Sequence, residues 1–176
     1  MNEGGIATVR FNTSGSGVGE DLVDFSDLKA FEKDTYSRQL EDVARVRAAI
    51  DAGDLGPLDP NRGVILGHSR GGGIAVLHAA DHPYQGLITW AAIDNVVRFD
   101  EATTNKWRED GYLDIPNTRT GQVMRIGIDA VHDVDENLER LNILEAAKRV
   151  TAPSLVIHGS LDESVSMDCS ERLADA

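Results

Sequence analysis

The chain has few cysteines, few basic residues and no long hydrophobic run, and each shortage excludes a class of protein. Its single cysteine, Cys169, cannot support an intrachain disulfide framework. The first residues have neither the basic end nor the apolar core of a signal peptide. No apolar stretch approaches the about 18 residues that a membrane-spanning helix needs. These shortages predict a cytoplasmic protein that is not embedded in a membrane.

Acidic residues outnumber basic residues by 30 to 17, which gives a formal net charge of -13. Such a charge repels phosphate backbones and anionic membrane surfaces, so we expect neither nucleic acid nor a membrane as a partner. No close set of histidine, aspartate and glutamate has the spacing of metal ligands, and we expect no cofactor. At 176 residues, 41% of them hydrophobic, the chain is long enough for one domain with a core.

Short apolar runs alternate with helical patterns along most of the chain. From Tyr36 to Ala52 the apolar residues recur every three or four positions, which predicts an amphipathic helix that Gly53 ends. The alternation of such helices with short strands indicates a parallel sheet. The predicted strands are residues 6–11, 63–67, 86–92 and 154–158.

The most informative segment is VILGHSRGGG, from Val64 to Gly73. An apolar strand breaks on glycines, places Ser69 at the tip of the turn and continues as an apolar helix to about Ala80, which is the order of a nucleophile elbow. We expect Gly67 and Gly71, two residues before and after the serine, to give the sharp turn its room. The alternative is a glycine-rich turn whose serine only caps the helix.

Residues 94–150 interrupt the alternation and predict an inserted helical lid. The lid is expected to contain no strand and to be helical near residues 137–144. It would separate a first core segment, residues 1–93, from a second, residues 151–176.

Side chains in and near the lid are candidates for an acyl pocket, with burial in the core as the alternative. They are Trp90, Trp107, Tyr112 and Met124. After the last strand, Asp168 with Glu171 is the expected cap of a final helix.

Two motifs together resemble the α/β-hydrolase superfamily, and most closely its dienelactone-hydrolase-like and prolyl-oligopeptidase-like branches. They are GHSRGG at residues 67–72 and PSLVIHGSLDESV at residues 153–165. The resemblance implies an α/β fold whose mostly parallel sheet has helices on both faces. It also implies Ser69 as nucleophile, Asp162 as the acid and the backbone amide of Arg70 as an oxyanion-hole donor. The implied reaction is acyl transfer from a small-molecule or peptide ester, lactone, thioester or amide through an acyl-enzyme.

An independent physical argument supports the pairing of the two residues. Reactive groups in an open parallel sheet gather at the carboxyl ends of its strands, and Ser69 and Asp162 both follow such ends. Asp94, after the strand at residues 86–92, is a rival acid, and the alternative for Asp162 is a solvated loop carboxylate.

The sequence lacks the histidine that the resemblance leads us to expect after Asp162. His68 adjoins the nucleophile and is poorly placed to reach its oxygen, so pocket lining is its expected role. His132, in the lid, is the only histidine free to approach as a substitute base. Structural roles are expected for the other three, His78, His82 and His158.

Two family features would precede Met1: the third strand and the loop that donates the second oxyanion amide. We therefore expect a portion of a longer hydrolase whose sheet is incomplete at both chain ends. The alternative is a hydrolase-like scaffold or binding module without catalysis.

Two other features are given non-catalytic interpretations. A glycine pattern at residues 15–19 is similar to a dinucleotide-binding turn, but Glu20 occupies the sixth position and its carboxylate would repel a pyrophosphate. Cys169 is expected to be a small buried residue rather than a thiol nucleophile.

Overall fold

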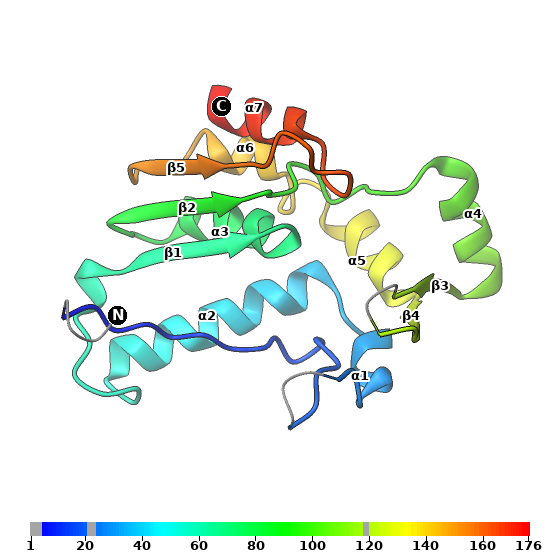
Figure 1. Cartoon of the computed structure of the whole chain (residues 1–176), viewed down its shortest axis with the longest axis horizontal. Helices are drawn as coiled ribbons and strands as arrows, with labels where there is room; N and C mark the ends of the chain where they lie inside the picture. Colours follow the sequence, from blue (N-terminus) through cyan, green and yellow to red (C-terminus); the bar gives the residue numbers. More distant parts are fainter. Residues whose placement is uncertain (1–4, 21–23, 118–119) are drawn as a thin grey trace.

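A parallel sheet forms the centre of the molecule, and the computed structural model describes residues 5–20, 24–117 and 120–176 (Figure 1). Within these ranges the sheet has three strands, which run in the same direction with β2 in the middle. The predicted α/β class with a mostly parallel sheet is confirmed. The strands, in their order across the sheet, are β1 (Val64–His68), β2 (Gly86–Trp90) and β5 (Ser154–Ile157).

One face of the sheet is buried against helices. Leu87 and Thr89 of β2 are only 4% and 2% exposed, because they lie on the face that packs against α3 (Arg70–Asp81). Burying an apolar side chain such as Leu87 is worth roughly 1.5–3 kcal/mol, so the apolar side chains on this face stabilise the fold. The largest members of the core include Ile74, Leu77, Ile93, Leu141 and Ile143.

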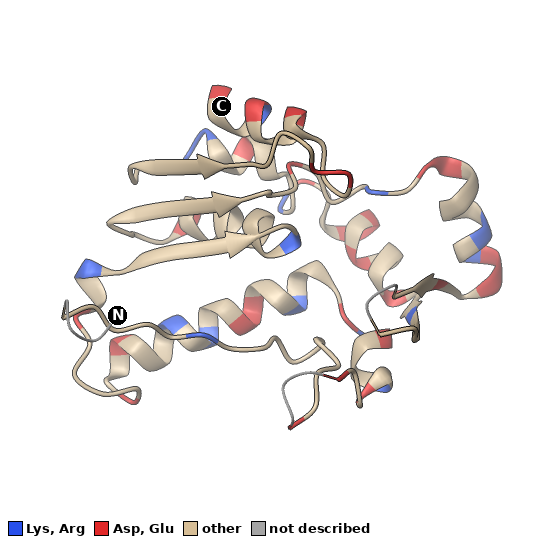
Figure 2. Cartoon of the chain, viewed as in Figure 1, with Lys and Arg blue, Asp and Glu red and all other residues tan. Residues whose placement is uncertain are grey.

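The other face is open in the described part of the chain. Five of the large apolar side chains on it are between 43% and 60% exposed, and Figure 2 shows no charged residue on these strands. Helices were predicted on both faces, but those that contact the sheet, α3 and α7 (Met167–Asp175), contribute to one and the same core. The exposed side chains are Val64, Leu66, Trp90, Leu155 and Ile157.

The long helix α2 (Tyr36–Ala52) has the bounds that the periodicity predicts. The side chain of Thr35 accepts a hydrogen bond from the Arg38 amide, and Gly53 ends the helix with a φ of 79°. A left-handed residue at this position favours glycine, which has no Cβ to clash. The helix packs against α3.

The remaining helices of the core are short. The final helix α7 begins after Ser166, whose side chain accepts from the Asp168 amide, so the predicted cap at Asp168 is wrong.

No helix in the described ranges is long and apolar enough to cross a membrane. The other short helices are α1 (Leu28–Glu32), the 3₁₀ helix η2 (Pro60–Arg62) and α6 (Ile143–Ala147).

The segment predicted as a helical lid contains two strands, so the prediction that it lacks strands is wrong. They pair antiparallel as a hairpin between α4 (Glu101–Asp110) and α5 (Asp129–Asn137). Because alternating side chains of a hairpin face opposite sides, two strands of five residues leave only a weak apolar signal in the sequence. Residues 138–142, expected to be helical, separate α5 from α6. The hairpin strands are β3 (Tyr112–Pro116) and β4 (Val123–Gly127).

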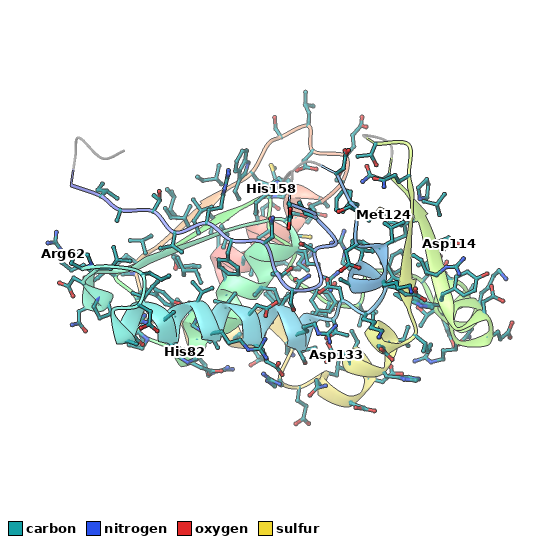
Figure 3. The ribbon with its side chains drawn as sticks, turned by 90° about the horizontal axis from the view of Figure 1, so that it is seen from below. Arg62, His82, Asp114, Met124, Asp133 and His158 are labelled. Carbon is teal, nitrogen blue, oxygen red and sulfur yellow. The ribbon has the colours of Figure 1, made fainter. Side chains whose placement is uncertain are left out.

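The lid segment has a small core of its own and is tied to the rest of the chain. Trp107, Ala130 and Val131 form this second cluster. The carboxylate of Asp133, on α5, accepts a hydrogen bond from the Ser37 amide in the first turn of α2 (Figure 3). A carboxylate at a helix N-terminus satisfies a free N–H and favours the helix dipole, so this contact fixes the lid against α2.

The strand predicted at residues 6–11 is absent. These residues are exposed and belong to no strand of the described chain. A β-rich sequence forms a strand only when another strand supplies hydrogen bonds, and no described strand pairs with this segment.

His78, on α3, is a buried histidine at the end of the core remote from the elbow. It is 1% exposed, its Nδ1 lies 2.9 Å from the hydroxyl of Tyr84, and its ring stacks on His82 with centroids 4.0 Å apart. Burial, helped by the neighbouring His82, lowers the pKa of His78 from 6.5 to about 4. The structural roles expected for His78 and His82 are consistent with these contacts.

The low pKa of His78 predicts a loss of stability in acid. Because the unfolded chain binds a proton at this site below pH 6.5 and the folded chain does so only near pH 4, the free energy of unfolding should fall across this window. The loss attributable to His78 is up to about 3 kcal/mol. Urea unfolding as a function of pH measures it. His78→Phe should flatten the profile and the exposed-site control His132→Gln should not; equal slopes in all three proteins would contradict the assignment.

Candidate active site

Ser69 occupies a strained backbone conformation between β1 and α3. Its φ of 53° and ψ of -121° lie in a region that residues with a Cβ rarely adopt. Backbone hydrogen bonds hold this conformation, since the Ser69 amide donates to the Trp90 carbonyl at 2.8 Å and the Ile93 amide donates to the Ser69 carbonyl at 3.2 Å. The structure therefore has the strand, sharp turn and helix of an elbow with Ser69 at its tip.

Close backbone contacts around the turn depend on glycine, but not on both glycines that the pattern suggested. A Cβ on Gly67 would lie 2.1 Å from the Gly71 carbonyl oxygen, and one on Gly72 would lie 2.4 Å from the Cβ of Ala92. A Cβ on Gly71 would meet nothing within 4 Å outside its own helix. The expectation that Gly71 needs to be small is therefore wrong, and Gly72 has that role.

The amide of Arg70, the residue expected to donate to an oxyanion, lies at the N-terminus of α3. Arg70 is the first residue of α3, and the first N–H groups of a helix have no acceptor within the helix. Their partial positive charge favours an anion at this end.

Asp162 lies in the loop after β5, and its carboxylate is held in a tight turn. Its Oδ1 accepts from the amides of Ser164 at 2.8 Å and Val165 at 3.0 Å. These two backbone hydrogen bonds, aided by the nearby His158 and His68, lower the pKa of the Asp162 carboxyl below its ordinary value of 3.8. Asp162 is therefore an anion at neutral pH, as an acid of a catalytic triad has to be.

His158 supports the loop of Asp162 rather than serving as a base. Its Nε2 donates to the carbonyl of Val165 at 2.8 Å, its Nδ1 lies 2.6 Å from the hydroxyl of Ser170, and its side chain is 4% exposed. With both ring nitrogens occupied, the imidazole has no site left for a proton from Ser69. The structural role expected for His158 is supported by this geometry (Figure 3).

Ser69 and Asp162 follow strands that end at the same edge of the sheet. In the register, His68 lies beside Trp90 and Trp90 beside Ile157, so the three carboxyl ends are aligned. The loops after β1 and β5 leave the sheet on the same side (Figure 1). His68 is exposed there, packs its ring 5.0 Å from that of Trp90, and contributes to the lowered pKa of Asp162.

The rival acid Asp94 is already paired. Its Oδ2 accepts a short hydrogen bond from Arg172 of α7. Partial burial raises the pKa of Asp94, but the hydrogen bonds from Arg172 and Cys169 and the charge of Arg172 together lower it below its ordinary value. Burial and the neighbouring Asp94 raise the pKa of the Cys169 thiol, which disfavours a nucleophilic thiolate. Asp94 and Arg172 instead line a cavity of roughly 640 Å³, whose other wall includes Leu138 and residues 141–144.

The four side chains proposed for an acyl pocket are not brought together. Trp90 is 54% exposed on the open face of the sheet, whereas Met124 is 4% exposed on β4. Trp107 belongs to the lid core, and the cavity that it lines contains neither Met124 nor Tyr112. Burial in the core explains two of them, Trp107 and Met124, better than a shared pocket does. Tyr112 is 37% exposed and stacks under the guanidinium of Arg125 at 3.6 Å.

The glycine pattern at residues 15–19 has packing roles. A Cβ on Gly15 would lie 2.3 Å from Oδ1 of Asp34, and Gly17 has a φ of 70° and abuts Phe31. No strand precedes this loop from residue 5 onward, and the five-residue α1 follows it. A dinucleotide-binding turn needs both a strand and a longer helix, so the geometry disfavours that interpretation.

One buried group at the elbow has no sequence motif. The carboxylate of Asp34, 4% exposed, lies 3.5 Å from the guanidinium of Arg70, and this guanidinium lies 4.1 Å above the ring of Tyr36. Only an unusual density of polar residues between α1 and α2 could have signalled it. The remaining histidine, His132, is exposed on α5, and none of its described contacts involves Ser69 or Asp162.

Comparisons with known proteins agree with this geometry. The model of the prolyl oligopeptidase family matches residues 1–176. A monoacylglycerol lipase from Paleococcus ferrophilus superposes with a TM-score of 0.59 at 16% identity, covering 82% of this chain and 62% of that one. An acylaminoacyl peptidase from Pyrococcus horikoshii superposes with a TM-score of 0.57 at 18% identity, covering 93% and 24%.

A third solved structure, Est1E from Butyrivibrio proteoclasticus, gives a TM-score of 0.57 at 18% identity and covers 81% of this chain and 57% of that one. A search of curated proteins finds no match. This chain thus spans less than two thirds of the length of each of these three structures. The resemblance to the α/β-hydrolase superfamily is confirmed.

The glycine contacts predict that alanine at neighbouring positions has very different effects on stability. Gly67→Ala and Gly72→Ala should each lower the free energy of unfolding by about 2–4 kcal/mol or prevent folding, because backbone or buried atoms occupy the space. Gly71→Ala should change stability by less than about 1 kcal/mol, since alanine favours the helix and meets open space. Urea unfolding of the three variants measures the difference. Equal destabilisation by all three would show that the turn is not built on these contacts.

Proposed function

Because this chain belongs to the prolyl oligopeptidase family, we propose that it carries the nucleophile and the acid of a serine hydrolase. The observation that carries the proposal is the backbone of Ser69, which has a φ of 53° at a strand-to-helix turn and is held by hydrogen bonds to the segment after β2. A serine that only caps a helix needs no such strain, and its side chain would accept a bond from the helix. Ser69 makes no such cap bond among the described residues.

In the proposed reaction, Ser69 attacks the carbonyl carbon of an ester, lactone, thioester or amide. Its hydroxyl proton passes to a base, and the Arg70 amide stabilises the negative charge on the carbonyl oxygen. Departure of the leaving group gives an acyl-enzyme, which water hydrolyses. Solved structures of similar fold include one named a monoacylglycerol lipase and one named an acylaminoacyl peptidase, so both ester and amide substrates are compatible with the fold.

The base is proposed to be an imidazole that stands between Ser69 and Asp162. All five histidines of the chain lie in described ranges, and no histidine side chain among them forms a hydrogen bond or ion pair with both residues. We propose that a longer polypeptide supplies this histidine, and that Asp162 orients it and stabilises its protonated form. The absence of such a histidine among these residues favours the second candidate, a hydrolase-like scaffold without catalysis.

A fluorophosphonate probe separates the two candidates. In a longer form that contains the proposed histidine, it should give one adduct, located at Ser69, because the base would activate this hydroxyl at the positive end of α3. Ser69→Ala should abolish labelling, whereas the control Ser160→Ala, at an exposed serine of the same sheet edge, should leave it unchanged. Peptide mapping by mass spectrometry locates the adduct. A protein that stays unlabelled, or that is labelled equally without Ser69, would favour the scaffold.

In a form that contains the base, the role of Asp162 can be tested with an isosteric change. Asp162→Asn keeps the oxygen that accepts from Ser164 and Val165, so the loop should hold its shape while the negative charge is lost. We expect kcat to fall by about 10³–10⁴-fold with little change in KM. The matched control is Asp94→Asn at the rival acid. A larger loss of kcat in that variant would transfer the role to Asp94.

A further inference from the structure

A buried polar cluster lies beside the elbow and joins three segments that are distant in sequence. Asp34, between α1 and α2, receives a hydrogen bond from the side-chain amide of Gln39 and faces the guanidinium of Arg70. The guanidinium lies on the ring of Tyr36, which is 8% exposed. Gly15 packs directly against the Asp34 carboxylate, so the glycine loop is part of the same contact.

The cluster is poorly designed for stability alone. Oδ1 of Asp34 and both Nε and Nη2 of Arg70 are buried, and none of them forms a hydrogen bond with a described residue. A buried donor or acceptor without a partner costs about 1–3 kcal/mol, and a buried ion pair often contributes no net stability. Burial raises the pKa of Asp34 although Arg70 opposes this effect. A cluster that costs stability next to a strained serine indicates a positional role.

The geometry connects the cluster to the reacting atoms. The N–H of Arg70 and the carbonyl of Ser69 belong to one planar peptide unit. On one side, the amides of Gly72 and Ile93 donate to the Ser69 carbonyl at 2.9 and 3.2 Å and hold this plane. On the other side, the plane continues into the Cα of Arg70, whose side chain is fixed between Asp34 and the ring of Tyr36.

We propose that Asp34 is a positioning residue, which holds the Arg70 guanidinium against Tyr36 and thereby fixes the peptide plane that presents the oxyanion donor. The catalytic part of this inference rests on the function proposed above, whereas the mechanical part does not. The same contact fixes the glycine loop against the elbow through Gly15. The contact needs a side chain at position 70 that is positively charged, planar and buried. Lysine has the charge but not the planar guanidinium, so it should not replace arginine.

The mechanical part is tested by amide hydrogen exchange, measured by NMR, on Asp34→Asn. The amides of Gly72 and Ile93 report the peptide plane, and that of Leu87, which donates to the Pro153 carbonyl at 3.0 Å, reports the sheet. Exchange at Gly72 and Ile93 should rise about tenfold relative to Leu87. The matched control is Asp133→Asn, another buried carboxylate beside the start of α2, which contacts Ser37 and not Arg70.

The catalytic part is tested, in the same longer form that contains the histidine, by the rate of Ser69 modification with the fluorophosphonate probe. Asp34→Asn should slow it about tenfold and Asp133→Asn should not, at equal stability in urea. If Ser69→Ala abolishes labelling while Asp34→Asn and Asp133→Asn are modified at equal rates, the positioning role is overturned and the proposed function stays intact. Labelling that does not need Ser69 would overturn the proposed function, and the exchange of Gly72 and Ile93 would still decide the mechanical part.

A second variant covers the case in which Asp34→Asn does not fold. Arg70→Lys keeps the positive charge facing Asp34 but loses the planar contact with Tyr36. It should reproduce the faster exchange at Gly72 and Ile93. Unchanged exchange at both amides in every folded variant of the cluster would overturn the proposal.

Discussion

Ser69 can hold its strained backbone only because β1 and α3 approach each other at backbone distance. The space between Gly67 and the carbonyl of Gly71 has no room for a Cβ, nor has the space between Gly72 and Ala92. These contacts bring the first turn of α3 directly under the end of β1, and the hydrogen bonds from the Ser69 amide and to its carbonyl then tie the turn to β2. Everything proposed for the site depends on this close packing, because it fixes the serine and the Arg70 amide together.

The acid is positioned by a different principle. Asp162 belongs to a loop, and a loop holds a charged side chain in place only where several local hydrogen bonds fix that side chain. Here two backbone amides hold the carboxylate, and the buried His158 fixes the Val165 carbonyl and Ser170 beneath it. These hydrogen bonds therefore link the strand, the loop and α7 to the acid.

Features that depend on local sequence could be predicted, and features that depend on distant partners could not. The period of α2, its end at Gly53 and the elbow at Ser69 follow from periodicity and backbone sterics alone. The segment at residues 6–11 has the composition of a strand but lacks a pairing partner, and the lid hairpin has a partner but little apolar pattern. Asp34 could not be identified because its role comes from Arg70 and Gly15, both far away in the sequence.

The open face of the sheet determines how these residues behave in water. Strands of a parallel sheet are ordinarily covered on both sides, yet five large apolar side chains here are about half exposed on an uncharged surface. A cover on this face would stabilise the protein by roughly 25 cal/mol for each Å² of apolar surface that it buries. The net charge of -13 keeps copies of the chain apart at long range, but it is distributed over helices and loops. A second surface that covered this uncharged apolar face would therefore meet no carboxylate on the strands themselves.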